Sequence, residues 1–214
     1  MSTLDDKILP RQPPTVLCLD MPTPKSAMPS RNAAQTRQRI LDAARRCFSS
    51  KSYENVGIRE IAGASGVDAA LVSRYFGGKE QLFAHVIEGA FNVEDHLPEN
   101  LEDIGAFLVG QVLNDEPQAD DDGFNPLRLL ILAAASPETA SVVSERFKLE
   151  FVHPLALRLG GKNADARAAL IAAYVIGIAT MRHLLDSPDL KLSAQDESMS
   201  LLVDAIQSCV IQPG

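Results

Sequence analysis

The feature that most limits how this chain can fold is a pair of short apolar segments, about 58–64 and 69–75, that flank Gly66-Val67-Asp68. Both segments carry apolar residues at helical spacing. Gly66 can adopt the left-handed conformation that a sharp turn between helices requires. Asp68 stands at an N-cap position, where its side chain accepts hydrogen bonds from the first free N–H groups of the next helix. Together with a longer preceding helix, this pattern predicts a helix-turn-helix.

The longer helix is expected over about 33–50. Ile40, Ala44 and Phe48 recur at helical spacing, and arginines occupy the other faces. Cys47 lies on the apolar stripe, so we interpret it as a small core residue; the alternative is a reactive thiol.

The second helix of a helix-turn-helix enters the major groove of DNA. Small residues at its start, Ala69 and Ala70, allow close approach to the bases, and Ser73 and Arg74 point toward bases or backbone. Tyr75 can donate its hydroxyl to a phosphate. The alternative for any single basic residue is an ordinary solvated helix face.

The next helix begins at Lys79, directly after Gly77-Gly78. Free N–H groups and the helix dipole favour an anion at such a start, so we expect Lys79 to contact a phosphate. The charge distribution agrees with this. The net charge is −8, but residues 31–91 hold nine Lys/Arg against six Asp/Glu, whereas residues 92–214 hold eight against nineteen. A modestly basic block on an acidic body is typical of a protein that presents one end to a polyanion.

Residues 36–48 and 58–83, "TRQRILDAARRCF" and "IREIAGASGVDAALVSRYFGGKEQLF", resemble the N-terminal domain of the TetR family of transcriptional regulators. The resemblance implies an all-α homodimer with two DNA-binding domains and a larger body that binds a small-molecule effector. It also implies a four-helix dimer interface made by the last two long helices. Most members are repressors that a ligand releases from palindromic double-stranded operators.

Carried over by position, the resemblance places Arg59 where family members contact base or phosphate, and it assigns the DNA-contacting roles to Ala69, Ala70, Ser73, Arg74, Tyr75 and Lys79 as well. Three residues depart from the family pattern. Gly57 and Gly78 stand where side chains usually cap helices, and Ser73 replaces a common Tyr. These departures affect which operator sequence the protein recognises. They also leave an alternative function open, that of a helical ligand-binding or scaffolding protein with weak or lost DNA binding.

We therefore predict an all-α fold of about nine helices in three regions. Residues 1–30, with six prolines, form a flexible arm that is either inert or touches DNA or a partner. Residues 31–90 form the DNA-binding domain, and residues 91–214 form the ligand-binding and dimerisation domain. Five helices are expected in the body, at about 99–114, 125–135, 137–158 with a bend at Pro154, 163–186 and 194–211.

The helix at 163–186 is apolar on two faces, so it must be covered on two sides. The chain's own core and a partner subunit provide that cover; the alternative is a large monomeric core. Glycine and small residues allow helices to approach closely. The residues that we assign to the dimer interface are Leu170, Gly177, Leu202 and Ile206.

The body also holds polar residues on otherwise apolar helices, and these are candidates for lining an effector pocket: His153, Tyr174, Met181 and His183. The alternative for each is a core or surface role. The four histidines form no metal-binding pair, and the sequence has no nucleophile elbow, phosphate loop or paired-cysteine motif. We therefore expect no enzyme activity, no metal and no cofactor.

The three cysteines and the N-terminal residues predict the cellular compartment of the protein. Three cysteines without CxxC spacing and without an export signal indicate free thiols in a reducing compartment. No apolar run approaches the roughly 18 residues of a membrane span. We expect a soluble cytoplasmic protein that does not enter a membrane.

Overall fold

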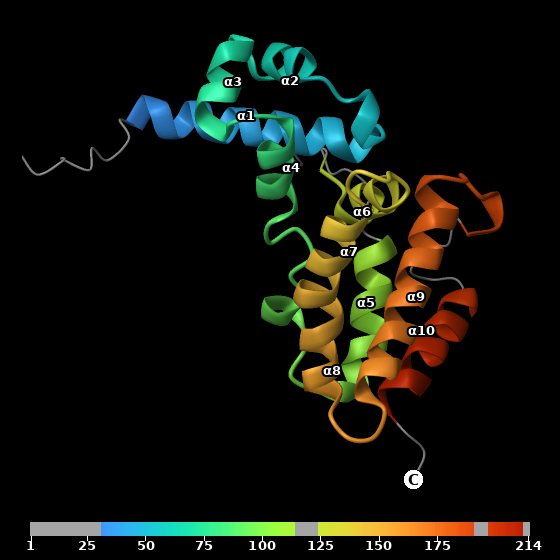
Figure 1. Cartoon of the computed structure of the whole chain (residues 1–214). Coiled ribbons are helices and arrows are strands. Elements are labelled where there is room, and N and C mark those ends of the chain that lie inside the picture. The colour runs from blue at the N-terminus through green and yellow to red at the C-terminus, as the bar shows by residue number, and fades with distance from the viewer. Residues whose placement is uncertain (1–30, 114–123, 191–196, 212–214) are drawn as a thin grey trace, which may run out of the picture.

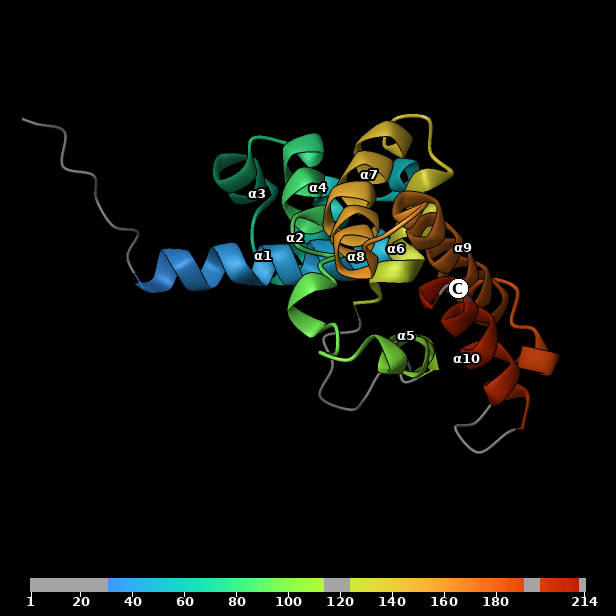
Figure 2. The same cartoon turned by 90° about the horizontal axis from the view of Figure 1, so that it is seen from below.

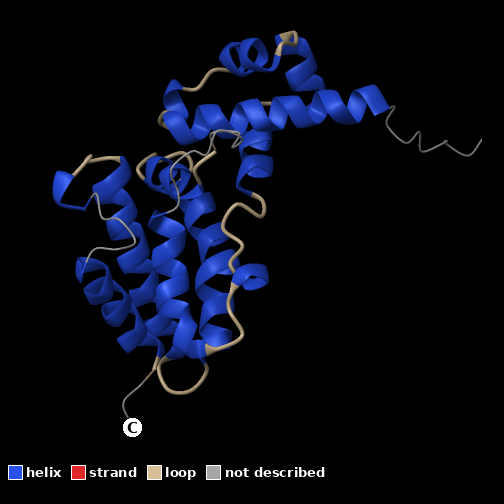
Figure 3. Cartoon of the chain, turned by 180° about the vertical axis from the view of Figure 1, so that it is seen from behind, coloured by secondary structure: helices blue, strands red, loops and turns tan. Residues whose placement is uncertain are grey.

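The computed structural model describes residues 31–113, 124–190 and 197–211, and every regular element within these ranges is helical (Figure 3). The predicted proline-rich arm, residues 1–30, and residues 114–123, which include Asp120, Asp121 and Asp122, lie outside the described residues. A head built from α1 (Arg31–Ser50) to α4 (Lys79–Ile87) lies across one end of an upright helical body (Figure 1). The predicted boundary at residues 90–91 falls in the linker that joins the two parts.

Four helices build the head, and they pack around buried aromatic side chains. Phe48 and Tyr53 stack at 5.7 Å, and Phe83 meets Phe48 edge to face at 5.2 Å. Burying large side chains such as these stabilises the head by about 1.5–3 kcal/mol each. The elements are α1 (Arg31–Ser50), η1 (Tyr53–Asn55), α2 (Ile58–Ser65), α3 (Ala69–Phe76) and α4 (Lys79–Ile87).

The turn between α2 and α3 confirms the predicted helix-turn-helix. Gly66 is left-handed, with φ 65° and ψ 37°, and its N–H donates to the carbonyls of Ala62 and Gly63. The Asp68 side chain caps α3 by accepting a hydrogen bond from the N–H of Ala70 at 2.7 Å. The residues of the turn therefore set the direction of α3 relative to α2.

The body contains helices that run alongside one another, and α1 of the head packs against α6. Viewed from below, α9 and α10 lie together at one side of the body, away from the head's α3 (Figure 2). The elements are η2 (Glu94–His96), η3 (Leu101–Asp103), α5 (Ile104–Leu113), α6 (Pro126–Ala134), α7 (Ala140–Phe147), η4 (Lys148–Val152), α8 (His153–Leu159), α9 (Ala164–His183), η5 (Pro188–Leu190) and α10 (Glu197–Val210).

The segments α7, η4 and α8 are continuous, so they form one irregular helix over residues 140–159, which includes Pro154, the position of the predicted bend. Proline has no N–H and cannot complete the α-helical ladder. The chain adapts with a π-helical turn, η4, in which the N–H of His153 donates to the carbonyl of Lys148. Counted as one helix, this unit gives nine helices in the described part of the chain, as predicted.

Helix α9 corrects the expectation about membrane spans. By length and composition alone, its 20 residues are apolar enough to cross a membrane. One face, with Ile171 and Val175, is buried in the core, while Leu170 and Tyr174 on another face are 55% and 42% exposed. A core helix of a soluble protein passes the same test, and this helix is already part of the body's core.

Candidate functional site

Helix α3 presents a small, polar surface to solvent. Val72 and Phe76 are buried and anchor it to the head. On the opposite side Ala70, Ser73 and Arg74 are exposed. The surface therefore has small apolar side chains at the start of the helix and a cation near its end. A helix that enters the major groove needs both properties.

The two remaining residues of the predicted α3 surface are half-buried. Ala69 and Tyr75 both pack against the hydrophobic core of the head. Tyr75 therefore has a structural contact in addition to the predicted phosphate contact.

Arg59 lies in the first turn of α2 and is exposed. The same helix is tied to the end of α1 by Lys51, whose Nζ lies 2.5 Å from Glu60 Oε1. The Lys51 hydrogen bond lowers the pKa of the Glu60 carboxyl, and the same bond raises the pKa of Lys51. Gly57 precedes α2 and provides no side-chain cap, in agreement with the prediction.

Lys79 begins α4 and is half-buried, because its Nζ lies 4.1 Å from the centre of the Tyr53 ring. A cation–π contact uses the ring face and leaves ammonium N–H groups available to an oxygen anion. Burial raises the pKa of Tyr53, so its ring stays a neutral phenol at pH 7. Gly78 offers no side-chain cap, which leaves the first N–H groups of α4 without a side-chain partner from that position.

An apolar cavity of about 160 Å³ lies beneath the linker that joins head and body. Three aromatic rings form much of its wall: Phe91 meets Phe147 edge to face at 5.6 Å, and Phe147 stacks on Phe151 at 5.0 Å. The polar side chains of the lining all belong to exposed residues, Asn92, His96 and Gln111. The remaining lining residues are Ala90, Val93, Leu108, Val112, Pro126, Leu127 and Val175.

None of the predicted pocket residues lines this cavity, and only two of the four share another depression. Tyr174 and Met181 lie on the outward face of α9, where they line a shallow apolar depression with Gly177. His153 is exposed at the first residue of α8, and His183 is half-buried at the last residue of α9. A helix that is apolar on two faces does not reveal in its sequence which face turns inward.

The predicted dimer residues differ in their exposure to solvent. Leu170 and Gly177 are exposed on α9, and Leu202 is half-buried on α10. Ile206 is fully buried inside the single chain, so its assignment to the interface is corrected. Leu201 on the same helix is 71% exposed, and the sequence pattern does not single it out because that pattern marks only the inward stripe of α10.

Sequence reasoning also missed the cavity itself. Its walls combine the linker, η2, α5, α6, α7, η4 and α9, which only the tertiary fold brings together. Clustered aromatic residues at 147 and 151 were the one local signal. Within the ranges that the structure describes, no group of three or more His, Cys, Asp or Glu side chains is placed to hold a metal ion.

Comparison with known proteins places both parts of the chain. The family model described as "Bacterial regulatory proteins, tetR family" matches residues 40–86, and "Tetracyclin repressor-like, C-terminal domain" matches residues 102–210. The HTH-type transcriptional repressors AcnR of Corynebacterium efficiens and of Corynebacterium glutamicum are each 38% identical over 66 residues, 30% of this chain. The match spans 35% of the length of either relative.

Solved structures match over most of the chain. A TetR-family regulator from Streptomyces coelicolor A3 is 26% identical, with 86% of this chain and 98% of that chain covered and a TM-score of 0.51. Salmonella enterica GusR is 18% identical, with 84% and 96% covered and a TM-score of 0.61. NalD of Pseudomonas aeruginosa, the secondary repressor of a multidrug efflux pump, is 18% identical, with 85% and 100% covered and a TM-score of 0.59. The last two likenesses concern the fold alone.

Proposed function

Because this chain belongs to the tetR family of bacterial regulatory proteins, we propose that it is a dimeric DNA-binding repressor that a small apolar molecule releases from a palindromic operator. The observation that carries the proposal is the exposed surface of α3 with its neighbours. Ala70, Ser73 and Arg74 on α3 and Arg59 on α2 are all open to solvent on a head of net positive charge. The AcnR relatives, each 38% identical to this chain over 66 residues, are repressors by name.

In this proposal the residues divide into two roles. Ala69, Ala70 and Ser73 allow α3 to approach base edges, and Arg59 and Arg74 reach bases or backbone. Lys79 and Tyr75 contact phosphates and fix the position of the head on the duplex.

A homodimer places two heads on inverted half-sites. Its support is the outward apolar face of α9, where Leu170, Tyr174 and Met181 are 55%, 42% and 37% exposed around Gly177. An exposed face of this kind on a 20-residue helix is suited to burial against a second copy. A soluble cytoplasmic location belongs to the same proposal, because operator DNA is found there.

The effector that we propose is a small apolar molecule about the size of one aromatic ring. An apolar protein cavity of roughly 150 Å³ holds benzene, and the cavity beneath the linker is about 160 Å³. Phe91, Phe147 and Phe151 can contact a ring edge to face, and His96 or Gln111 can bond one polar substituent at the mouth.

Benzene and toluene are suitable probes for this cavity. Binding to the folded state should raise the melting temperature in proportion to ligand concentration. Val112→Phe, which fills the cavity, should abolish the increase. Val142→Phe, at an exposed position outside the cavity, is the matched control and should keep it. An increase that survives Val112→Phe would place the ligand elsewhere.

A second candidate function is favoured by one specific observation. Neither Gly57 nor Gly78 caps its helix with a side chain, and Ser73 stands where the family pattern commonly has a larger Tyr. The starts of α2 and α4 are therefore held less firmly, and α3 offers one large contact fewer. A helical ligand-binding or scaffolding protein with weak DNA binding would have these features. In the proposed function the chain acts by binding and has no catalytic role.

Binding to a random-sequence duplex over a range of salt concentrations separates the two functions. A DNA-binding head should bind non-specifically at roughly 10⁻⁴–10⁻⁶ M near physiological salt, and its affinity should fall linearly with the logarithm of salt concentration. A scaffolding protein should show no such salt-dependent binding.

A further inference from the structure

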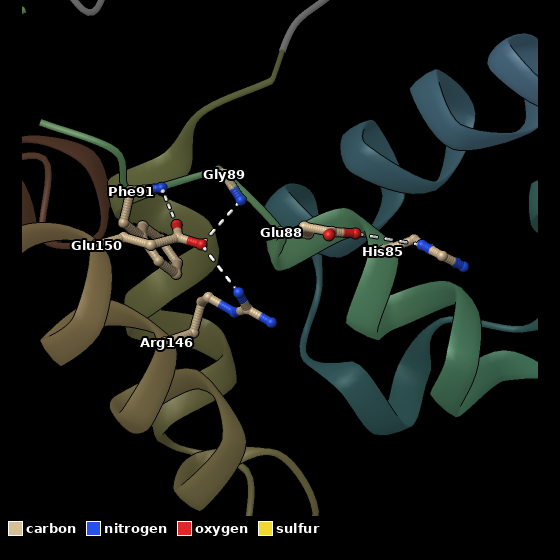
Figure 4. Close-up of polar contacts among 6 residues, drawn as sticks. All are labelled: His85, Glu88, Gly89, Phe91, Arg146 and Glu150. Atoms are coloured by element: carbon tan, nitrogen blue, oxygen red, sulfur yellow. Dashed lines mark hydrogen bonds and ion pairs between the residues drawn. The ribbon is translucent and has the colours of Figure 1, made fainter. Parts of the chain in front are cut away.

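The linker between α4 and η2 is fastened to the body by Glu150 (Figure 4). The N–H of Gly89 donates to Glu150 Oε1 at 2.9 Å, and the N–H of Phe91 donates to Glu150 Oε2 at 3.1 Å. Arg146, one turn earlier on the same irregular helix, donates to Oε1 at 3.3 Å. Both carboxylate oxygens are therefore occupied, and the Glu150 side chain is only 14% exposed. Hydrogen bonds to a carboxylate are stronger than those between neutral groups.

The main chain of Glu150 adds a third bond. In an α-helix its carbonyl would accept from residue 154, but Pro154 has no N–H to donate. The carbonyl of Glu150 instead accepts from the N–H of Val93 at 3.2 Å. We call the three bonds from Gly89, Phe91 and Val93 to Glu150 the Glu150 clamp. The proline and the π-helical turn therefore free an acceptor that the linker uses.

The head touches the body at a second place, where α1 packs on α6 and the Ser136 hydroxyl donates to Glu54 of η1. The cavity lies between the two attachments, because residues 90–93 of the linker and Pro126 and Leu127 of α6 all line it. Without the clamp, the head would remain attached at α6 but could pivot there.

We propose that Glu150 is a positioning residue that fixes the orientation of the head, and that the clamp is the point at which a ligand in the cavity acts on that orientation. This rests on the proposed function, in which the orientation of two heads decides how well they fit an operator. Phe147 and Phe151 line the cavity from the irregular helix that carries Glu150, and Phe91 and Val93 of the clamp line it from the linker. The rings of Phe91 and Phe147 meet edge to face at 5.6 Å. In this proposal a molecule that enters between Phe91 and Phe147 pushes the linker away from the irregular helix and so lengthens the clamp bonds. Such a ligand shifts DNA affinity by its differential affinity for the clamped and released states.

The test uses the full-length protein with Glu150→Ala, and Glu145→Ala as the control. Glu145 is an exposed glutamate on the same irregular helix. Two readouts need no DNA. Hydrogen exchange at Gly89 and Phe91 should be at least about tenfold faster in Glu150→Ala than in the control. Spin labels at Ala64→Cys in the head and Leu157→Cys in the body should give a broader distance distribution.

A third readout uses DNA. Wild type should discriminate between its best operator and the same half-sites moved apart by one base pair. Glu150→Ala should reduce that discrimination roughly tenfold, because pivoting heads fit both spacings. Glu150→Gln should be intermediate, because its amide oxygen can accept one N–H while its NH₂ group faces the other.

Pro154→Ala gives an independent approach in case Glu150→Ala does not fold. The new N–H competes for the Glu150 carbonyl, so exchange should quicken at Val93 while Gly89 and Phe91 stay protected. The proposal is overturned if exchange and distance distributions in Glu150→Ala match the control, or if exchange quickens and the distribution stays narrow. A wild-type chain that binds no duplex contradicts the proposed function, and the two DNA-free readouts still judge the clamp.

Discussion

Gly177→Leu should stabilise the single chain and weaken its dimer. Gly177 lies within α9, and a Cβ at this position meets nothing within 4 Å inside the chain. Leucine has a higher helix propensity than glycine, so each protomer should gain roughly 0.8 kcal/mol. In the proposed interface the added side chain meets the partner helix instead. Overpacking costs about 1–3 kcal/mol per site, and both protomers carry the change, so the dimer should lose about 2–6 kcal/mol. The dissociation constant should therefore rise roughly 30-fold or more.

Sedimentation over a wide range of protein concentrations measures this constant directly. Gly63→Leu is the matched control, because Gly63 is also an exposed helical glycine with nothing within 4 Å of a Cβ, but it lies on α2 of the head. The control should dimerise as wild type does. Wild type that remains monomeric at micromolar concentration, or Gly177→Leu that dimerises as tightly as wild type, would refute the reasoning.

Three further predictions concern recognition, stability and thiol chemistry. Lys79→Ala should weaken binding to all duplexes alike and lower the salt slope by about one counterion. Arg59→Ala should reduce the binding free energy by about 1–3 kcal/mol on the operator and by much less on random DNA. The reverse pattern in a binding titration would exchange their roles. Arg167 is 8% exposed and donates to the carbonyls of Gly160, Lys162, Cys209 and Val210. Arg167→Met should therefore lower the free energy of unfolding by roughly 3–5 kcal/mol and the melting temperature by about 6–20 °C. An unchanged melting curve would contradict this. Burial, aided by Glu60, raises the pKa of the Cys47 thiol, so iodoacetamide should label Cys47 more slowly than Cys209 at pH 7 and faster as the pH rises; equal rates at pH 7 would show that Cys47 is open.

The head was predictable because its signals are local. Gly66 and Asp68 act on residues within one helical turn, so their left-handed and capping roles follow from the sequence and are confirmed by the structure. The π-helical turn before Pro154 follows equally from the chemistry of one residue.

The body was less predictable because its decisive contacts join distant segments. Ile206 was correctly placed on an apolar stripe, but a stripe does not indicate whether its cover comes from the same chain or from a partner. Glu150 resembles an ordinary solvated helix residue in the sequence, and its bonds reach back about sixty residues to the linker. Tyr174 and Met181 needed the tertiary fold to show that they face outward.

Selection of bound duplexes from a random pool tests the central claim most directly, because it reports affinity, symmetry and spacing together. A dimer with two heads should enrich inverted half-sites whose centres are about 34–36 Å apart or a simple multiple of that distance, with one dimer bound to each site. A pool that shows no enrichment, or an asymmetric site fully occupied by one protomer, would contradict the account.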